Sequence, residues 1–192
     1  EFDSLRYAMT RVLLFEGKVR GGDNIKEHEA YGPLHYQLDD VFGYFKSSVH
    51  EVITNKKYKQ PNTRRYENYP LVAVEEALAN AMYHREYEYG EHIEVSVFSD
   101  RLEIWSVPGP LPPIQPADLK ALSFENTQLP RTRSRNRRVG DFLKLLGYTE
   151  GFSTGVNKII TSMQRNGSPM PKFETDDARS YFLVTLYKHK AA

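Results

Sequence analysis

The chain has 192 residues, enough for one large domain or two small ones whose core needs no covalent cross-links. It contains no cysteine, which excludes disulfides and thiolate metal sites and fits a cytoplasmic location. The formal net charge is +1, from 26 basic and 25 acidic residues, so the surface as a whole should not attract polyanions. No apolar run approaches the roughly 20 residues that cross a bilayer, and we expect no membrane contact.

The chain begins with Glu1 rather than Met, and we expect it to be part of a longer protein whose other domains hold part of the function. The apolar residues 5–15 end at Glu16-Gly17 and suit a strand that enters a loop. Apolar residues then recur every three or four positions to about Asn55, which predicts an amphipathic helix: Leu34, Leu38, Val41, Phe42, Phe45, Val49 and Val52. Residues 56–70 are polar and basic with two prolines, and we expect a connecting loop.

A helix is predicted over residues 70–87, because Pro70 suits a first helical turn and Glu75 and Glu76 follow near the positive helix end. "HIEVSVFS" and "RLEIWS" alternate apolar and polar residues, which predicts a hairpin of two strands over residues 92–106. The four prolines of residues 107–113 predict an irregular loop after the second strand.

A short helix is expected over residues 116–122. "VGDFLKLLG" predicts a helix closed by Gly147. Another helix should begin at Ser153 or Thr154 and end at Gly167. Aromatic and β-branched residues predict a strand over 180–188.

This order of elements predicts an α+β fold, a layered α/β sandwich in which helices cover one face of a mixed or antiparallel sheet. We expect two parts in the chain. Residues 1–66 form a strand, a helix and a connecting loop packed on a main domain of residues 67–190.

A polar stripe runs along the predicted helix 70–87. On a helical wheel, Leu78 and Met82 fall on one side, and Glu76 and Asn80 fall roughly opposite, one turn apart. The stripe is either an ordinary solvated helix face or the floor of a binding site. Small alanines beside the polar residues favour a site, because they leave room for a ligand. A carboxylate and an amide oxygen at this spacing suit hydrated Mg²⁺, with Glu76 as a base for water and Asn80 as the metal ligand.

Four sequence blocks, over roughly residues 69–175, resemble one family in the same order. "YPLVAVEEALANAMYHREY", "DRLEIWSVPGPLP", "SRNRRVGDFLKLLG" and "EGFSTGVNKIITSM" are similar to the motifs of RecG-related, Schlafen-type proteins. The C-terminal domain of that family is classed with the GHKL (Bergerat) fold of histidine-kinase and gyrase ATPases. The resemblance implies an ATP-binding regulatory domain, with ATP and Mg²⁺ as ligands, in a bacterial DNA-associated or transcriptional regulatory protein.

The resemblance also implies roles for individual residues. Glu76 would be the catalytic base and Asn80 would hold Mg²⁺ through the nucleotide. The remaining nucleotide-binding positions that it implies are His84, Arg85, Gly109, Leu111, Arg135, Asn136, Thr154 and Gly155. Thr154 and Gly155 would present backbone N–H groups to phosphate at a helix N-terminus.

Three departures from the motifs keep an alternative open. Glu86 stands where the family has Asp, and Ser153 replaces the first glycine of "GTG". The stretch "SVPGPLP" stands where the ATPases of this fold have an adenine-binding loop that contains an acidic residue, and it has none. The alternative is a non-catalytic GHKL-like module for dimerisation or for docking nucleic acid or protein, and whether the chain is a weak ATPase stays open. No "GxxxxGK[ST]" phosphate loop occurs, so the chain carries no helicase motor.

Two other groups of residues suggest partners. Residues 131–138, "RTRSRNRR", hold five arginines that could bind DNA phosphates together with flanking domains, or ATP, or only water. His84, Glu88 and His92 are evenly spaced, as metal ligands can be, but Gly90 interrupts a helical arrangement. A homodimer is also compatible with the sequence.

Overall fold

The structure is a computed structural model that describes residues 8–22, 24–55, 64–88, 91–131, 134–148 and 154–192. Its elements in chain order are β1 (Thr10–Leu14), β2 (Lys26–Ala30), α1 (Leu34–Ser48), β3 (Val52–Asn55), β4 (Arg64–Glu67), α2 (Leu71–His84), β5 (Ile93–Val97), β6 (Arg101–Ser106), α3 (Pro116–Lys120), α4 (Arg137–Leu145), α5 (Gly155–Asn166), β7 (Lys172–Glu174) and β8 (Phe182–Tyr187).

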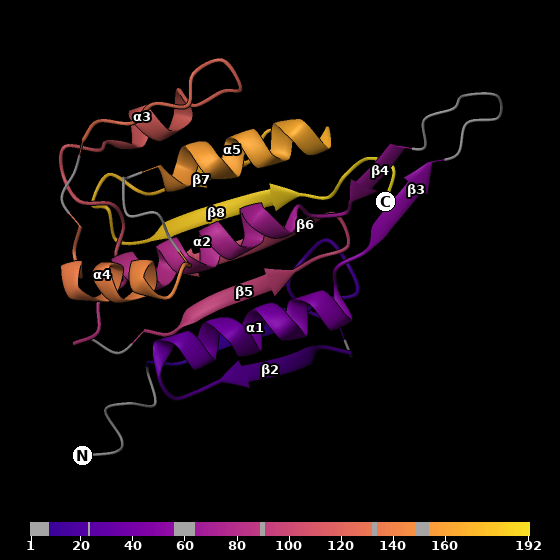
Figure 1. Ribbon diagram of the computed structural model, residues 1–192, viewed down its shortest axis with the longest axis horizontal. Helices are drawn as coiled ribbons and strands as arrows, with labels where there is room; N and C mark the ends of the chain where they lie inside the picture. Colours follow the sequence, from indigo (N-terminus) through magenta and orange to yellow (C-terminus); the bar gives the residue numbers. More distant parts are fainter. Residues whose placement is uncertain (1–7, 23, 56–63, 89–90, 132–133, 149–153) are drawn as a thin grey trace.

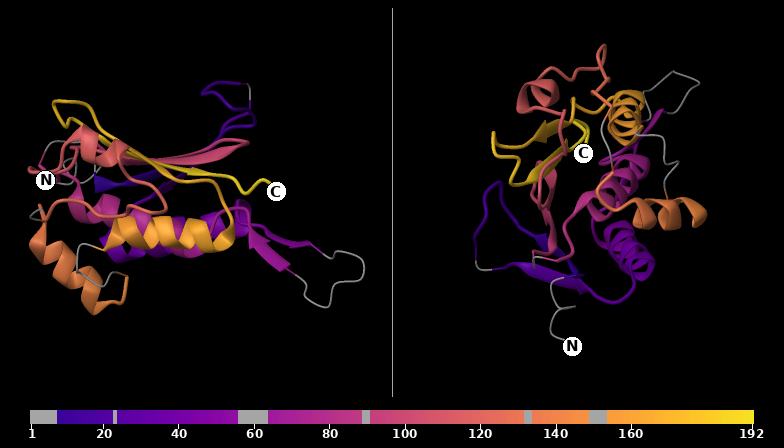
Figure 2. Two further views of the ribbon diagram at one scale, coloured as in Figure 1. Left: turned by 90° about the horizontal axis from the view of Figure 1, so that it is seen from above. Right: turned by 90° about the vertical axis from the view of Figure 1, so that its left-hand side faces the viewer.

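Six strands form one mixed sheet in the order β2-β1-β5-β6-β8-β7 (Figure 1). β1 and β5 run parallel, and every other neighbouring pair in this sheet is antiparallel. Helices α1, α2 and α5 lie side by side against one face of the sheet (Figure 2). The predicted α+β class and layered sandwich are therefore confirmed.

The first part of the chain contributes directly to this sheet, because β1 lies between β2 and β5. Thr10 and Leu14 of β1 pair with Ile93 and Val97 of β5. The division into parts at residue 66 stays a prediction.

The core lies between the sheet and the three helices. Alternate residues of the strands face α1, α2 and α5, as the alternation in the sequence requires. The buried side chains on this interface include Val12, Val95, Ile104, Val184 and Leu186 from the sheet and Leu38, Phe45, Val74, Leu78, Met82 and Ile160 from the helices.

Two predictions between residues 34 and 70 are wrong. The first helix ends at Ser48, not near Asn55, and Val52 begins β3 with 56% of its surface exposed. The expected loop contains β4, which pairs with β3 in a projecting hairpin (Figure 1). Residues 56–63 of that loop lie outside the described part of the chain. The Asn68 side chain fixes the segment after this helix in a non-helical conformation, because it donates to Val49 O and accepts from Glu51 N–H.

The other elements differ from the prediction mainly at their ends. α2 stops at His84, three residues early, and α3 ends at Lys120. The strands β2 and β7 were not predicted, because "KEHEA" has no apolar alternation and β7 has only three residues. Gly167 ends α5 in the left-handed conformation, as predicted.

Candidate functional site

Helix α2 is the middle helix of the layer, so it is buried by the sheet on one side and by α1 and α5 beside it (Figure 1). Glu67 accepts a hydrogen bond from Leu71 N–H at 2.7 Å, which satisfies one free donor of the first turn. Glu76, on the side away from Leu78, is only 4% exposed, and Asn80 is half-buried one turn later. The Glu76 end of the polar stripe is thus not a solvated face, because the first turn of α5 packs against it.

Gly155, the first residue of α5, packs directly against the stripe. A Cβ atom added to Gly155 would lie 2.7 Å from Glu76 Oε1 and 2.8 Å from Asn80 Oδ1, and closer still to Asn80 Nδ2. Real Cβ atoms do not approach heavy atoms so closely. With Glu76 and Asn80 in these positions, only glycine lets the backbone of α5 lie against them.

Lys158, one turn further along α5, forms an ion pair with Glu76. Its Nζ lies 3.2 Å from Glu76 Oε2, and the Lys158 side chain is 36% exposed whereas that of Glu76 is 5% exposed. On its other oxygen, Glu76 accepts a long hydrogen bond of 3.5 Å from Asn80 Nδ2. The Lys158 ammonium therefore neutralises a carboxylate that would be costly to bury alone.

An apolar cavity of about 90 Å³ adjoins Asn80 near the C-terminal end of α2. Four residues that the sequence suggested line it: Asn80, His84, Gly109 and Leu111. The further lining residues are Pro108, Pro110, Ile114, Leu119, Leu129, Val156, Ile159, Phe173, Phe182 and Val184. The sequence does not mark these residues, because apolar residues on helices and strands carry the same pattern whether they fill a core or line a cavity.

Gly109 brings the loop after β6 close to the turn before β8. Its N–H donates to Arg179 O at 2.8 Å, and an added Cβ would lie 2.6 Å from Tyr181 O. The cavity wall at this point is therefore backbone, and a larger residue would push the loop out of place.

His84, the last residue of α2, lines the cavity. Burial, with a smaller contribution from the nearby Arg135 charge, lowers the pKa of His84 to about 4. The imidazole is therefore neutral at physiological pH, and it can donate or accept a hydrogen bond without bringing a charge into the apolar cavity.

Arg135 and Asn136 bind the C-terminal end of α2. The Arg135 guanidinium donates to His84 O at 3.1 Å and to Gly109 O at 3.3 Å. The Asn136 amide donates to Tyr83 O at 3.1 Å and to Arg85 O at 2.6 Å. These side chains satisfy carbonyls that a helix end leaves without partners, and they join α2 to the loop at Gly109.

Arg85 is 2% exposed and is not among the described residues that line the cavity. Its guanidinium donates to Met9 O at 3.2 Å and to Glu91 O at 2.6 Å, and it lies over the Tyr87 ring at 4.9 Å. Arg85 thus holds the start of β1 and the segment before β5 against the end of α2.

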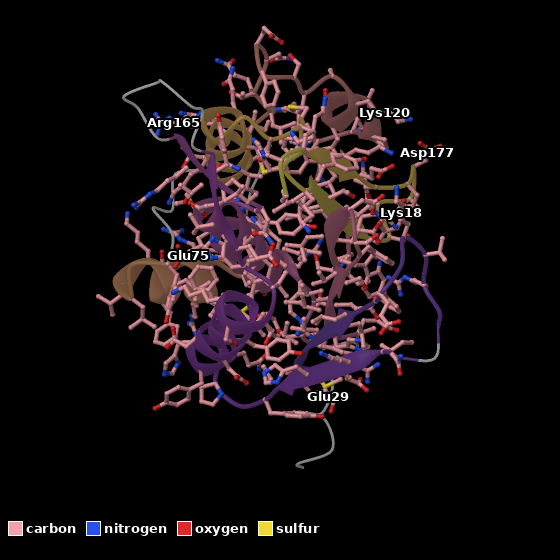
Figure 3. The ribbon with its side chains drawn as sticks, turned by 90° about the vertical axis from the view of Figure 1, so that its right-hand side faces the viewer. Lys18, Glu29, Glu75, Lys120, Arg165 and Asp177 are labelled. Atoms are coloured by element: carbon pink, nitrogen blue, oxygen red, sulfur yellow. The ribbon has the colours of Figure 1, made fainter. Side chains whose placement is uncertain are left out.

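A groove of about 630 Å³, lined mainly by polar residues, lies between α5 and the start of α2. Its walls are Glu67, Pro70, Val72, Thr154, Asn157, Lys158, Thr161, Ser162, Arg165 and Asn166. Figure 3 shows Arg165 on the helical side of the molecule, at α5. Thr154 is exposed at the start of this groove and makes no side-chain cap bond to α5. Gly155 separates the groove from Asn80 and the apolar cavity.

The arginines of residues 131–138 differ in exposure among the described residues. Arg131, Arg137 and Arg138 are exposed, whereas Arg135 is tied to backbone carbonyls, and Arg133 lies outside the described part. No group of three histidine or acidic residues that could hold a metal ion occurs in the described ranges, so His84, Glu88 and His92 do not gather into one. None of the helices described here has the length and apolar character needed to cross a bilayer.

A family model described as "Putative ATP-dependent DNA helicase recG C-terminal" matches residues 90–186, half of the chain. The chain belongs to the RecG C-terminal family. The matched region contains Gly109, Arg135, Thr154 and Gly155 but begins after α2, so Glu76 and the other predicted residues of α2 lie outside it.

The fold of this RecG C-terminal family member also resembles a solved structure, the DIP2311 protein from Corynebacterium diphtheriae. The TM-score is 0.69 at 23% sequence identity, and the match covers 97% of this chain. It covers only 34% of the DIP2311 chain, so the chain spans about a third of the protein it matches. A search of curated proteins finds no significant match.

The ligands that the RecG C-terminal fold family implies fit this site unequally. The volume of the apolar cavity beside Asn80 is several times the roughly 10–15 Å³ that one buried water requires, so its size and apolar lining do not exclude an organic group. Mg²⁺ does not fit between α2 and α5. The ammonium of Lys158 lies beside Glu76, and the backbone of Gly155 lies on Asn80.

Proposed function

We propose that this domain binds an adenine nucleotide, with the base in the apolar cavity beside Asn80. The observation that carries this proposal is the cavity itself, which lies where α2, the Gly109 loop and the first turn of α5 meet. Binding would regulate a larger bacterial protein that acts on DNA or transcription, as membership of the RecG C-terminal family suggests.

The composition of the cavity supports a base as its occupant. Phe173, Phe182 and Ile114 offer apolar contacts to the faces of a planar ring. The Asn80 amide and the neutral His84 imidazole offer hydrogen bonds at its edge. A few placed polar groups in an apolar cavity are the usual composition of small-molecule sites.

Thermal unfolding in the presence of ATP, ADP or adenosine tests the proposal. A ligand at a hundred times its Kd stabilises the folded state by about 2.7 kcal/mol. For a chain of this size the melting temperature should rise by roughly 2–4 °C per kcal/mol.

A cavity-filling variant identifies the binding site. Val156→Trp puts an indole into the cavity and should abolish the shift relative to the ligand-free variant. Leu145→Trp on α4, where Leu145 is 82% exposed, is the matched control and should keep the shift. An unchanged shift in Val156→Trp would place the nucleotide elsewhere, and no shift in the unmodified protein would refute binding.

A second candidate function is a docking module that keeps the fold without the nucleotide. The Glu76–Lys158 ion pair favours it, because it turns the predicted catalytic base into a contact between helices. Failure of all three ligands in the unfolding experiment would favour this candidate. DNA would then be the first partner to test, through the exposed Arg137 and Arg138.

A further inference from the structure

We infer that Asn80 meets the base in the cavity only as a hydrogen-bond acceptor, because Glu76 fixes its amide, and that the site therefore selects a base with an amino group. Asn80 then determines specificity, and Glu76 is a positioning residue that acts through it. The inference rests on the proposed function and names the part of the adenine base that the cavity recognises.

Asn80 and His84 supply the polar side chains of the cavity wall. The other described residues that line the cavity are a glycine, two prolines and apolar residues. The loop "SVPGPLP", which forms part of the wall, contains no acidic residue that could accept a hydrogen bond. A side-chain hydrogen bond from the described wall to a bound base must therefore come from these two residues of α2.

The orientation of the Asn80 amide follows from its contact with Glu76. The Glu76 side chain forms an ion pair with Lys158, so it is a carboxylate, and a carboxylate can only accept hydrogen bonds. Asn80 Nδ2 donates to Glu76 Oε1 at 3.5 Å. The reversed amide would place Asn80 Oδ1 against Glu76 Oε1, with no hydrogen between two acceptors. The charge of Glu76 therefore keeps Nδ2 on its own side.

The oxygen of the same amide is left for a ligand. The two terminal atoms of an amide diverge from one carbon, so Asn80 Oδ1 points away from Glu76, toward the turn of α2 where His84 lines the same cavity. Among the described residues, no donor bonds to Asn80 Oδ1. The backbone of Gly155 lies against the amide and leaves it little room to turn. An acceptor at an apolar cavity favours a ligand that brings a donor.

Adenine carries the matching groups at one edge. Its amino group is a donor, and a ring nitrogen beside it is an acceptor. The amino group can donate to Asn80 Oδ1. His84, one turn along α2, is neutral because burial lowers its pKa to about 4, and its ring N–H can donate to the ring nitrogen. Hypoxanthine has a carbonyl oxygen in place of the amino group, which would put a second acceptor opposite Asn80.

Calorimetric titration with three nucleosides tests the inference on the unmodified protein. Purine riboside is adenosine without the amino group, and inosine has a carbonyl oxygen in its place. Adenosine should bind at least about tenfold more tightly than purine riboside, which corresponds to 1.4 kcal/mol, because the analogue leaves Asn80 Oδ1 without a donor. Inosine should also bind more weakly than adenosine.

Asn80→Leu removes the acceptor and keeps a side chain of similar size. In this variant adenosine and purine riboside should bind with the same Kd. The ratio of two Kd values within one protein does not depend on the fraction that is folded, so a loss of stability cannot imitate this result. Asn157→Leu, on an exposed position of α5 outside the cavity wall, is the matched control and should keep the preference for adenosine.

Glu76→Gln tests the positioning role. A glutamine amide can donate as well as accept, so the Asn80 amide can turn and present Nδ2 to the cavity. The preference for adenosine over inosine should then shrink, because the turned amide can donate to the carbonyl oxygen of inosine. A residue that served only the stability of α2 would leave this ratio unchanged.

The outcomes separate this inference from the proposed function. Equal binding of adenosine and purine riboside by the unmodified protein would overturn the inference and leave the proposed function standing. A preference for adenosine that survives in Asn80→Leu would show that another group reads the amino group. An unchanged ratio in Glu76→Gln would remove the role of Glu76. No binding of any of the three nucleosides or of ATP and ADP would refute both proposals.

Discussion

The backbone of Gly155 lies against the side chains of Asn80 and Glu76, and this contact joins α5 to α2 at the polar stripe. The contact explains why a glycine suits the first position of α5 in this chain. In this structure Gly155 packs against α2.

Gly155→Ala should destabilise the fold. The added methyl group would lie within 2.8 Å of terminal atoms of Asn80 and Glu76, so these side chains or α5 must shift, and overpacking of this kind costs typically about 1–3 kcal/mol. Gly43→Ala on α1 is the matched control, because nothing lies within 4 Å of its added Cβ. The control should gain about 0.5–1 kcal/mol from helix propensity. Urea unfolding measures both, and equal stability of the two variants would contradict the described packing.

Removal of Lys158 and removal of the Glu76 charge should lower the free energy of unfolding by different amounts. Lys158→Met leaves a carboxylate that is 5% exposed without this partner, and breaking a buried pair costs about 3–5 kcal/mol. Glu76→Gln should cost less, because the Lys158 ammonium is partly exposed and can turn to water. A double-mutant cycle by denaturant unfolding measures the coupling. A larger loss for Glu76→Gln than for Lys158→Met would show that the ion pair is not buried as described.

Arg135→Lys should destabilise the domain by about 1–2 kcal/mol. Arg135 reaches His84 O from Nε and Gly109 O from Nη2, and a lysine, whose donors all sit on one nitrogen, lacks this fork, so we expect one carbonyl to lose its partner. Arg137→Lys changes an exposed arginine two residues away and should stay within about 0.5 kcal/mol. Thermal unfolding compares the stability of the two variants. Backbone amide hydrogen exchange in the loop at Gly109 should become faster only in Arg135→Lys.

Folding stability should depend on pH through His84. Its pKa in the folded state is lowered to about 4, mainly by burial, while the unfolded chain keeps a value near 6.5. The unfolded state therefore takes up the proton first as pH falls, so the contribution is complete above pH 6.5 and is lost between about 6.5 and 4. The loss is at most about 3 kcal/mol.

His84→Gln isolates this effect, because glutamine does not titrate. The difference in unfolding free energy between the two proteins should be constant above pH 6.5 and shrink below it. An NMR titration of the His84 ring that shows a midpoint near 6.5 would disprove the burial of this side chain.

DNA binding by this domain, the second candidate function, should depend on Arg137 and Arg138. Both side chains are exposed, and each phosphate contact contributes about −0.9 to the slope of log K against log salt concentration. Replacing both by alanine should therefore flatten the slope by roughly two in an anisotropy titration with duplex DNA. An unchanged slope would exclude the two arginines from the interface.

Local patterns in the sequence predicted several elements well, because they depend on neighbouring residues only. The alternation in residues 93–106 specified β5 and β6, and Gly167 marked the end of α5. The spacing of Glu76 and Asn80 correctly placed both on one side of α2. The resemblance of four blocks led to the RecG C-terminal family, which the matched residues show.

Other features depend on contacts between distant residues, and only the tertiary structure decided them. β2 exists because its backbone pairs with β1, although its residues Lys26 to Ala30 carry no strand pattern. The apolar spacing continues to Val52, but the helix does not. The Asn68 side chain bonds the backbone at Val49 and Glu51, just after the end of α1.

The same reason applies to the candidate site. The sequence could show that Glu76 and Asn80 share a helix face, but a helical wheel carries no information about what covers that face. Lys158 comes within 3.2 Å of Glu76 only because α5 folds back along α2, 82 residues later in the chain. The sequence by itself determined the chemical groups of the stripe. The packing of α5 decided which charge they face and how much space remains beside them, because both depend on the position of a second helix.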